Sequence, residues 1–237
     1  MNVGERFVRQ MDIFNPDEHK IPVTIIGAGA TGSYLALALA KMGMRNIIIF
    51  DGDNVEEHNF PNQLFPLSSI GKNKAKETAR IVEEYTGTKI KALPYMYREN
   101  YLSGIIVSAV DKMSVRKLIL DKIKFQEEID IVSNKAKFLI DPRSGSETAL
   151  IYSIYTSDKE GMKKYEKTLH PDEEAEQVPC TSRAIIYSVL ILSGMIASII
   201  RKYLTGKEIP SELIIDIINN RIIDTSVLEE SRKWKKN

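Results

Sequence analysis

A glycine-rich turn follows an apolar run near the start of the chain. The turn contains Gly27, Gly29 and Gly32, with Thr31 beside the last glycine. Glycines at this spacing allow backbone N–H groups to approach a phosphate at the start of a helix. A second apolar run ends in Asp51, about 20 residues after the turn, where an acid can hold ribose hydroxyls. The two features together predict a nucleotide-binding site.

Charged side chains surround the segment that follows Asp51. Asp53 is either a ligand contact or a solvated turn acid, and the sequence leaves both interpretations open. Lys72, Lys74 and Lys76 crowd the start of the next predicted helix. The N-terminus of a helix disfavours cations by roughly 0.3–1 kcal/mol each, so a lysine fixed there indicates an anionic partner. For Lys72 and Lys76 a flexible, solvated cluster is the alternative.

Asp111 follows the apolar run 104–109, where the chain turns into another helical pattern. An acid at this point can cap the helix, and its position alone favours that role. It can also hold Mg²⁺ against nucleotide phosphates, directly or through water. Arg116, about one helical turn later, either pairs with Asp111 or faces solvent.

Three neutral hydrogen-bonding residues, Asn59, Asn62 and Gln63, lie in the segment 52–68, in which two prolines forbid a regular helix. Taken alone they are typical turn residues, although they lie close to the suspected phosphate site. Cys180 lies near the expected start of an apolar helix, which would make a thiol more acidic. A lone cysteine is by default an inert, small apolar residue.

The composition excludes several classes of protein. The 237 residues include 33 basic and 32 acidic side chains, and a net charge of +1 provides no general attraction to nucleic acid or to a membrane. One cysteine rules out an internal disulfide framework and a cysteine-cluster zinc site, and it fits a reducing cytoplasm. The N-terminus is charged and has no apolar signal region. The uncharged run 184–200 falls short of a typical membrane span, which favours a buried helix.

These residues need a scaffold in which strands and helices alternate. We expect parallel strands at 22–27, 46–50, 89–94, 104–109 and 129–134, and helices at 30–43, at 71–86 with Ser69 as its cap, and at 111–124. This alternation predicts an α/β fold with a doubly wound, mostly parallel, Rossmann-like sheet.

The pattern changes beyond residue 134. We expect antiparallel strands at 136–140 and 148–155 joined by 141–145, a mobile crossover loop at 157–179, an apolar helix at 184–204 and a hairpin at 211–225. An N-terminal arm, 1–20, carries a short helix at 3–12. We therefore expect one domain that covers residues 1–237.

Taken together, these motifs resemble the ThiF/MoeB-type adenylyltransferases, relatives of the ubiquitin-activating enzymes, over nearly the whole chain. Each motif is modest alone, but their order and spacing make the set specific. The matching segments are 6–10 (the N-terminal Arg-Tyr-x-Arg-Gln motif), 27–32 (the glycine turn), 51–55 with Asn59 and Gln63 (Asp-x-Asp-x-Val…Asn…Gln), 70–74 (the family lysine at Lys74) and 110–116 (Asp-Asn-x-x-x-Arg).

The resemblance implies a chemistry in which ATP and a carboxylate form an acyl-adenylate and release pyrophosphate. The substrate would be the C-terminal glycine of a small ubiquitin-like or sulfur-carrier protein, or a peptide. By similarity, Lys74 contacts the phosphates, Asp111 holds Mg²⁺, and Asn59 and Gln63 organise the pocket. Arg9 would act across a homodimer, and Cys180 aligns with the cysteine that in some members joins the activated carrier.

The chain departs from this family in three respects. Asn62 stands where the family has an arginine, and a transition-state arginine in other phosphoryl-transfer enzymes contributes about 10³–10⁵ in rate. Either Arg9, Lys72 or Arg116 compensates for its loss, or the activity is weak. The paired Cys-x-x-Cys motifs are absent, so no zinc is expected. No appended rhodanese or ubiquitin-fold domain is visible.

Two other functions fit parts of the sequence. An NAD-dependent oxidoreductase shares the glycine turn and the acid, but it leaves Lys74 and Asp111 without a task. A non-catalytic or weakly active nucleotide-binding relative, acting as an assembly or regulatory partner, is motivated by Asn62 in place of arginine.

Overall fold

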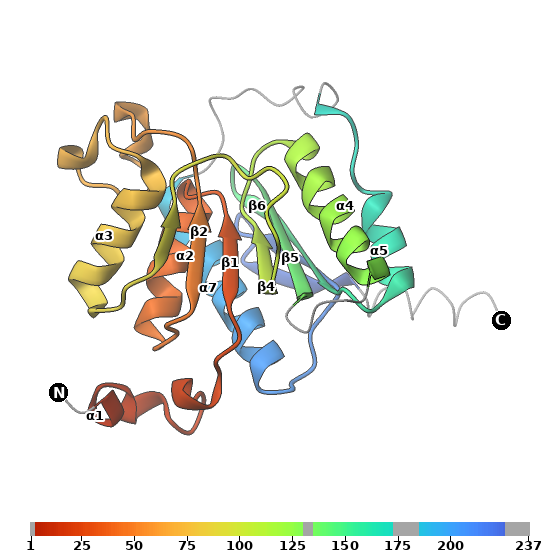
Figure 1. Cartoon of the computed structure of the whole chain (residues 1–237), viewed down its shortest axis with the longest axis horizontal. Coiled ribbons are helices and arrows are strands. Elements are labelled where there is room, and N and C mark those ends of the chain that lie inside the picture. Colours follow the sequence, from red (N-terminus) through yellow and green to blue (C-terminus); the bar gives the residue numbers. More distant parts are fainter. Residues whose placement is uncertain (1–2, 130–134, 173–184, 226–237) are drawn as a thin grey trace.

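The computed structural model describes residues 3–129, 135–172 and 185–225, and Cys180 lies outside these ranges. The described chain forms one eight-stranded sheet in the order β3-β2-β1-β4-β5-β6-β7-β8 (Figure 1). Neighbouring strands from β3 to β5 are parallel, and those from β5 to β8 are antiparallel. The strands are β1 Val23–Ile26, β2 Ile47–Phe50, β3 Lys91–Leu93, β4 Gly104–Ser108, β5 Ala136–Gly145, β6 Thr148–Tyr155, β7 Glu212–Asp216 and β8 Arg221–Asp224. The predicted doubly wound sheet with an antiparallel continuation is confirmed.

Helices cover both faces of the sheet (Figure 1). They are α2 Ala30–Lys41, α3 Lys74–Thr86, α4 Met113–Ile129, α5 Lys159–Glu166 and α7 Ile186–Leu204, while α1 Val3–Phe7 belongs to the N-terminal arm. Side chains of α2, α3 and α7 form one buried cluster with the sheet, and those of α4 and α5 form a second. Every residue of β1 and β4 is buried, as expected for parallel strands with helices on both sides.

The helix α3 begins later than predicted because another residue caps it. The side chain of Asn73 accepts a hydrogen bond from the Lys76 amide, and Gly87 ends the helix in the left-handed conformation at φ 72°. Ser69 does not cap α3; its hydroxyl donates to the Glu77 carboxylate at 2.7 Å. The cap therefore places Lys74 at the first position of the helix.

The predicted strand at 129–134 is wrong at its first residue, because α4 continues to Ile129; residues 130–134 lie outside the described ranges. The side chain of Gln126 bonds to both the amide and the carbonyl of Leu102, at 3.1 and 2.9 Å, and this holds the last turns of α4. The strand that pairs in parallel with β4 is instead β5, which runs through 141–145 without a break.

The predicted crossover loop at 157–179 contains the helix α5 at its start. Asp158 caps this helix by accepting hydrogen bonds from the amides of Glu160 and Gly161. Tyr165 and Met162 are buried against the sheet, so this part of the segment is packed structure. The remainder of the predicted loop from residue 173 onward lies outside the described ranges.

The outer elements largely follow the sequence. The hairpin of β7 and β8 is confirmed, and Asn220 in its turn has φ 52°. The predicted helix 3–12 is shorter, with α1 followed by a 3-10 turn at Val8–Gln10. By length and composition α7 would suffice to span a membrane, a test that a core helix also passes. Here α7 packs one face against α2 and the sheet.

Candidate nucleotide site

The predicted site residues meet where three neighbouring parallel strands end. Ile26 of β1 pairs with Phe50 of β2 on one side and with Ser108 of β4 on the other. The residues that follow these strands are the glycine turn, Asp51 and residues 109–111. Because β1 lies between β2 and β4, the connections diverge here to opposite sides, which is where doubly wound sheets bind ligands. We refer to this edge as the carboxyl rim.

Each glycine of the turn has a separate physical reason. Gly27 has φ 101°, and a Cβ there would lie 2.2 Å from the carbonyl oxygen of Ala109. A Cβ on Gly32 would lie 1.9 Å from the Gly27 oxygen, so this glycine lets α2 approach the turn. At Gly29, by contrast, a Cβ would meet no atom of the described chain within 4 Å. Gly29 is also the N-cap of α2, and no side chain caps it. The space beside Gly29 is therefore open, and a helix N-terminus without a side-chain cap is a favourable place for an anion.

Gly27→Ala is expected to lower the free energy of unfolding by about 2–5 kcal/mol, through the left-handed backbone and the clash with Ala109. Gly29→Ala is the matched control: its stability should stay within about 1 kcal/mol of wild type, because the added methyl meets nothing. Urea unfolding of both variants measures the difference. Equal destabilisation by the two substitutions would contradict this account of the turn.

The Asp51 side chain connects the glycine turn to the segment that follows β2. Its carboxylate is buried and accepts hydrogen bonds from the Ala28 amide at 2.7 Å and the Asp53 amide at 2.8 Å. Burial raises the pKa of the Asp51 carboxyl, although the two amide hydrogen bonds act in the opposite direction. Each carboxylate oxygen has a second lone pair, so this bracing is compatible with the ribose contact, which stays a prediction.

Lys74 is the fixed lysine that the sequence suggested. Its side chain is only 12% exposed, and its Nζ lies 3.5 Å from the Asp53 carboxylate. The side-chain amide of Asn73, a residue without a predicted role, donates to the backbone carbonyls of Asp51 and Asp53 at 3.0 and 3.1 Å. Its place just before a helical run was the available signal. Lys72 and Lys76 are exposed, in keeping with the solvated alternative.

The three neutral residues of segment 52–68 differ in burial and in hydrogen bonding. Asn59 is buried, and its side-chain oxygen accepts from the Glu56 amide at 2.9 Å, which is the role of a turn residue. The side-chain oxygen of Gln63 is also buried but has no hydrogen-bond partner within the described ranges. Asn62 is partly exposed, and its amide donates to the Asn59 carbonyl at 3.3 Å. The side-chain oxygen of Gln63 is thus a buried acceptor that no donor of the described residues satisfies.

Arg9 lies far from the carboxyl rim of its own chain. The arm packs at the opposite end of α2, where Gln10 donates to the Met42 carbonyl at 2.8 Å (Figure 1). With 12 residues, α2 separates the arm from the glycine turn by about 18 Å. Thr31 does lie at the rim, in the first turn of α2, where its carbonyl accepts from Ser193 at 3.2 Å.

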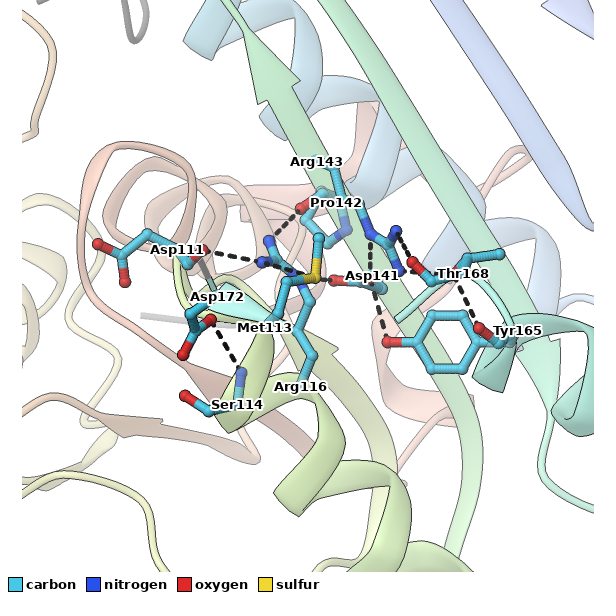
Figure 2. Close-up of polar contacts among 10 residues, drawn as sticks. All are labelled: Asp111, Met113, Ser114, Arg116, Asp141, Pro142, Arg143, Tyr165, Thr168 and Asp172. Atoms are coloured by element: carbon cyan, nitrogen blue, oxygen red, sulfur yellow. Dashed lines mark hydrogen bonds and ion pairs between the residues drawn. The ribbon is translucent and has the colours of Figure 1, made fainter. Parts of the chain in front are cut away.

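Arg116 takes neither of its two predicted positions. It is buried, its Nε donates to Asp141 Oδ1 at 2.8 Å, and its Nη1 donates to the backbone carbonyl of Asp111 at 3.1 Å. It therefore neither faces solvent nor pairs with the Asp111 carboxylate, which points away from it in Figure 2. Since its guanidinium is engaged in this way, Arg116 cannot replace the family arginine at Asn62.

The start of α4 is held by an acid from a distant segment. Asp172 accepts a hydrogen bond from the Ser114 amide at 3.1 Å, and its contacts with Ser114 lower the pKa of the Asp172 carboxyl (Figure 2). The Asp111 side chain is exposed at the rim. No group of three or more potential metal ligands exists among the described residues. Mg²⁺ commonly uses one or two carboxylates together with phosphate oxygens and water, and Asp111 fits that requirement.

A buried polar cluster behind Asp111 was not foreseen from the sequence. We call it the Asp141 cluster; its members are Arg116, Asp141, Arg143, Tyr165 and Thr168 (Figure 2). Asp141 is fully buried, and its second oxygen accepts from Arg143 at 2.8 Å and Tyr165 at 3.1 Å. Arg143 also donates to the Thr168 carbonyl and hydroxyl at 3.0 and 2.8 Å. The only local signal was the pair Asp141 and Arg143, two residues apart on one face of a strand.

The charges of this cluster depend on one another. Burial opposes ionisation of Arg143, but the adjacent Asp141 carboxylate outweighs it and raises the pKa of the guanidinium. Burial and the same carboxylate raise the pKa of the Tyr165 hydroxyl, which therefore stays a hydrogen-bond donor. The cluster consequently holds two cations, one buried and one largely buried, around one fully buried anion.

The fold and the rim define a doubly wound α/β protein with an open glycine turn suited to phosphate. The chain belongs to the ThiF family, whose family model matches residues 17–235. This confirms the family resemblance found in the sequence.

Three curated relatives illustrate the range of this family. Adenylyltransferase and sulfurtransferase MOCS3-1 of Zea mays is 32% identical over 108 residues, which is 42% of this chain and 23% of the relative. The NEDD8-activating enzyme E1 catalytic subunit of Arabidopsis thaliana is 34% identical over 108 residues, with the same coverage of 42% and 23%. The tRNA threonylcarbamoyladenosine dehydratase of Bacillus subtilis is 29% identical over 170 residues, or 64% of this chain and 66% of the relative. The matched segment thus spans about a quarter of the first two relatives.

Solved structures share the fold at low sequence identity. E. coli MccB with AMPCPP and MccA has a TM-score of 0.71 at 17% identity, covering 94% of this chain and 71% of MccB. E. coli MccB with ATP has a TM-score of 0.63 at 16% identity, covering 92% and 69%. PaaA has a TM-score of 0.68 at 16% identity, covering 93% and 72%.

Proposed function

We propose that this protein is an ATP- and Mg²⁺-dependent adenylyltransferase that activates a C-terminal carboxylate as an acyl-adenylate. The observation that carries the proposal is the convergence of the open turn at Gly29, the largely buried Lys74 and the exposed Asp111 on one rim. The substrate is the C-terminus of a small ubiquitin-like or sulfur-carrier protein, or a peptide. The names of the relatives and the MccB complexes with ATP, AMPCPP and MccA support this class of substrate.

In the proposed reaction a substrate carboxylate oxygen attacks the α-phosphorus of ATP. A new bond forms between that oxygen and phosphorus, the bond to the β-phosphate oxygen breaks, and pyrophosphate leaves with the bonding electrons. No side-chain nucleophile and no proton transfer are required. The difficulty is to hold two anions together, so catalysis consists of positioning and charge stabilisation.

Each residue of the carboxyl rim has a separate role in this proposed reaction. The first amides of α2 bind phosphate oxygens, and Lys74 places an ammonium group beside them. Asp111 would hold Mg²⁺, which when bound neutralises phosphate charge. Asp51 keeps the glycine turn in place and receives the ribose.

We further propose a homodimer in which Arg9 of one copy serves the rim of the other. The separation of Arg9 from its own rim supports this arrangement. Cys180 is the proposed acceptor of the activated carboxylate in a later transfer.

Exchange of labelled pyrophosphate into ATP, measured with candidate carrier proteins or peptides, tests the proposal. Exchange that depends on both Mg²⁺ and a free substrate C-terminus is the expected result. ATP binding without exchange for any C-terminal carboxylate would count against it. A preference for NAD(H) over Mg-ATP would instead support an oxidoreductase.

A non-catalytic or weakly active relative is the second candidate. It is favoured by Asn62 in place of the family arginine, together with the burial of Arg116 against Asp141. The protein would then bind nucleotide and act as an assembly or regulatory partner.

Asn62→Arg is expected to raise the exchange rate at least about tenfold, because a phosphate-directed arginine in related chemistry contributes about 10³–10⁵. Asn62→Gln is the matched control, since it lengthens the side chain without adding charge, and it should leave the rate within about twofold. Steady-state exchange at saturating ATP measures both variants. No turnover in wild type or in Asn62→Arg would favour the regulatory candidate.

A further inference from the structure

Arg116 connects the strand β5 to the turn that carries Asp111. Its guanidinium donates to Asp141 Oδ1 at 2.8 Å, to the Asp111 carbonyl at 3.1 Å and to the Pro142 carbonyl at 3.4 Å (Figure 2). Asp141 and Pro142 belong to β5, whereas Asp111 lies before the first residue of α4. One rigid fork therefore ties the main chain at Asp111 to the central sheet.

The anchor of this fork is itself fixed. The Asp141 carboxylate is fully buried on a strand paired on both sides, and Arg143 and Tyr165 occupy its second oxygen. Because two donors share this oxygen, either one keeps the buried carboxylate in place, and Asp141 in turn sets the direction of the Arg116 fork. The carboxylate of Asp111 points away from the Asp141 cluster, and the Asp111 side chain is exposed (Figure 2).

Stability is a weak explanation for such a cluster. Replacing a buried ion pair with well-packed apolar residues is often neutral or stabilising, because removing charges from water costs several kcal/mol per ion. What charged, forked side chains add is a defined geometry. A group that binds a ligand must be held within about 0.5 Å of its productive position by the residues that support it.

We infer that Arg116, held by Asp141, is a positioning residue that orients Asp111 for Mg²⁺ and the nucleotide phosphates. The inference rests on the proposed function, because it needs Asp111 to bind Mg²⁺. It adds that the Mg²⁺ concentration needed for ATP binding depends on the contact between Arg116 and the Asp111 backbone carbonyl. Arg143 bonds to Thr168 and makes no contact with Asp111, and Tyr165 still holds the second Asp141 oxygen when Arg143 is replaced by lysine.

The experiment compares Arg116→Lys with Arg143→Lys in ATP binding, measured by calorimetry over a series of Mg²⁺ concentrations. Lysine keeps the charge near Asp141 but lacks the fork that reaches Asp111 and Pro142 as well. We expect R116K to need at least fivefold more Mg²⁺ for half-maximal ATP binding, with affinity recovered at saturating Mg²⁺. R143K, the matched control, should stay within twofold of wild type throughout. Thermal unfolding of both variants monitors the fold.

A second comparison separates positioning from general loosening. In an Asp111→Asn background the Mg²⁺ requirement is already raised, and adding R116K should cause no further shift, because both changes act through one contact. If R116K does not fold, Asp141→Glu displaces the same anchor while keeping its charge and should give the same fivefold shift.

The outcomes are distinct. An equal shift for R116K and R143K, no shift for R116K, or additive shifts in the Asp111→Asn background would overturn the inference while leaving the proposed function intact. A wild-type protein that binds no ATP at any Mg²⁺ concentration would overturn both.

Discussion

Asp141→Ala is expected to lower the free energy of unfolding by about 3–5 kcal/mol. The substitution leaves the buried guanidinium of Arg116 and the largely buried one of Arg143 without their anion, and it removes the acceptor of the Tyr165 hydroxyl. A buried charge without a partner retains its full desolvation penalty. Urea unfolding followed by circular dichroism measures the loss.

Asp158→Ala is the matched control for this prediction. Asp158 caps α5 at the surface, and the loss of such a cap costs about 0.5–2 kcal/mol. The difference between the two aspartates isolates the burial of charge from the simple loss of a carboxylate. If Asp141→Ala destabilised the protein no more than Asp158→Ala, the cluster would contribute no more than a helix cap.

Lys74→Ala is expected to reduce the rate of ATP–pyrophosphate exchange by about 10²–10³-fold, comparable to the loss of one preorganised donor at a transition state. Its side chain is largely buried beside Asp53, at the first position of α3, so its ammonium group is held close to the phosphate site. The free energy of unfolding should change by less than about 1 kcal/mol, because the partner Asp53 is half exposed and such ion pairs contribute little. Exchange kinetics and urea unfolding on the same preparation test both statements.

Lys76→Ala serves as the control for Lys74. Lys76 lies in the same turn of α3 but is exposed, and its substitution should leave exchange within about twofold of wild type. Similar losses at both positions would show that the lysines act only through a general positive potential, and the role of Lys74 would have to be withdrawn.

Several features could be predicted because they depend on local chemistry. Gly27 and Gly32 mark positions that no side chain can occupy, and the spacing to Asp51 follows from one helix between two strands. Alternation of short apolar runs with helical patterns predicted the sheet and most of its strands. The local sequence predicts Ser69 as the cap of α3, whereas Asn73 caps it, because serine and asparagine suit that position equally well.

The misplaced elements share a cause. Residue 129 lies both at the end of an apolar helical pattern and at the start of a strand-like run, so the local sequence is ambiguous there. The hydrogen bonds of Gln126 with Leu102 stabilise the helical alternative, and α4 extends to residue 129. The charged composition of 159–166 suggested a loop, although a cap at Asp158 and two buried side chains were enough to form α5. Tertiary contacts routinely override weak local preference.

By itself the sequence determined the family, the doubly wound sheet and the residues at the rim, because glycine turns, helix caps and apolar periodicity act over short stretches of chain. The tertiary structure alone decided what Arg116 does and where Arg9 lies. Arg116 and Asp141 are 25 residues apart, and their pairing follows from the parallel placement of β4 beside β5. Interactions of this kind depend on which strands become neighbours in the sheet, and no local sequence pattern predicts the order of the strands.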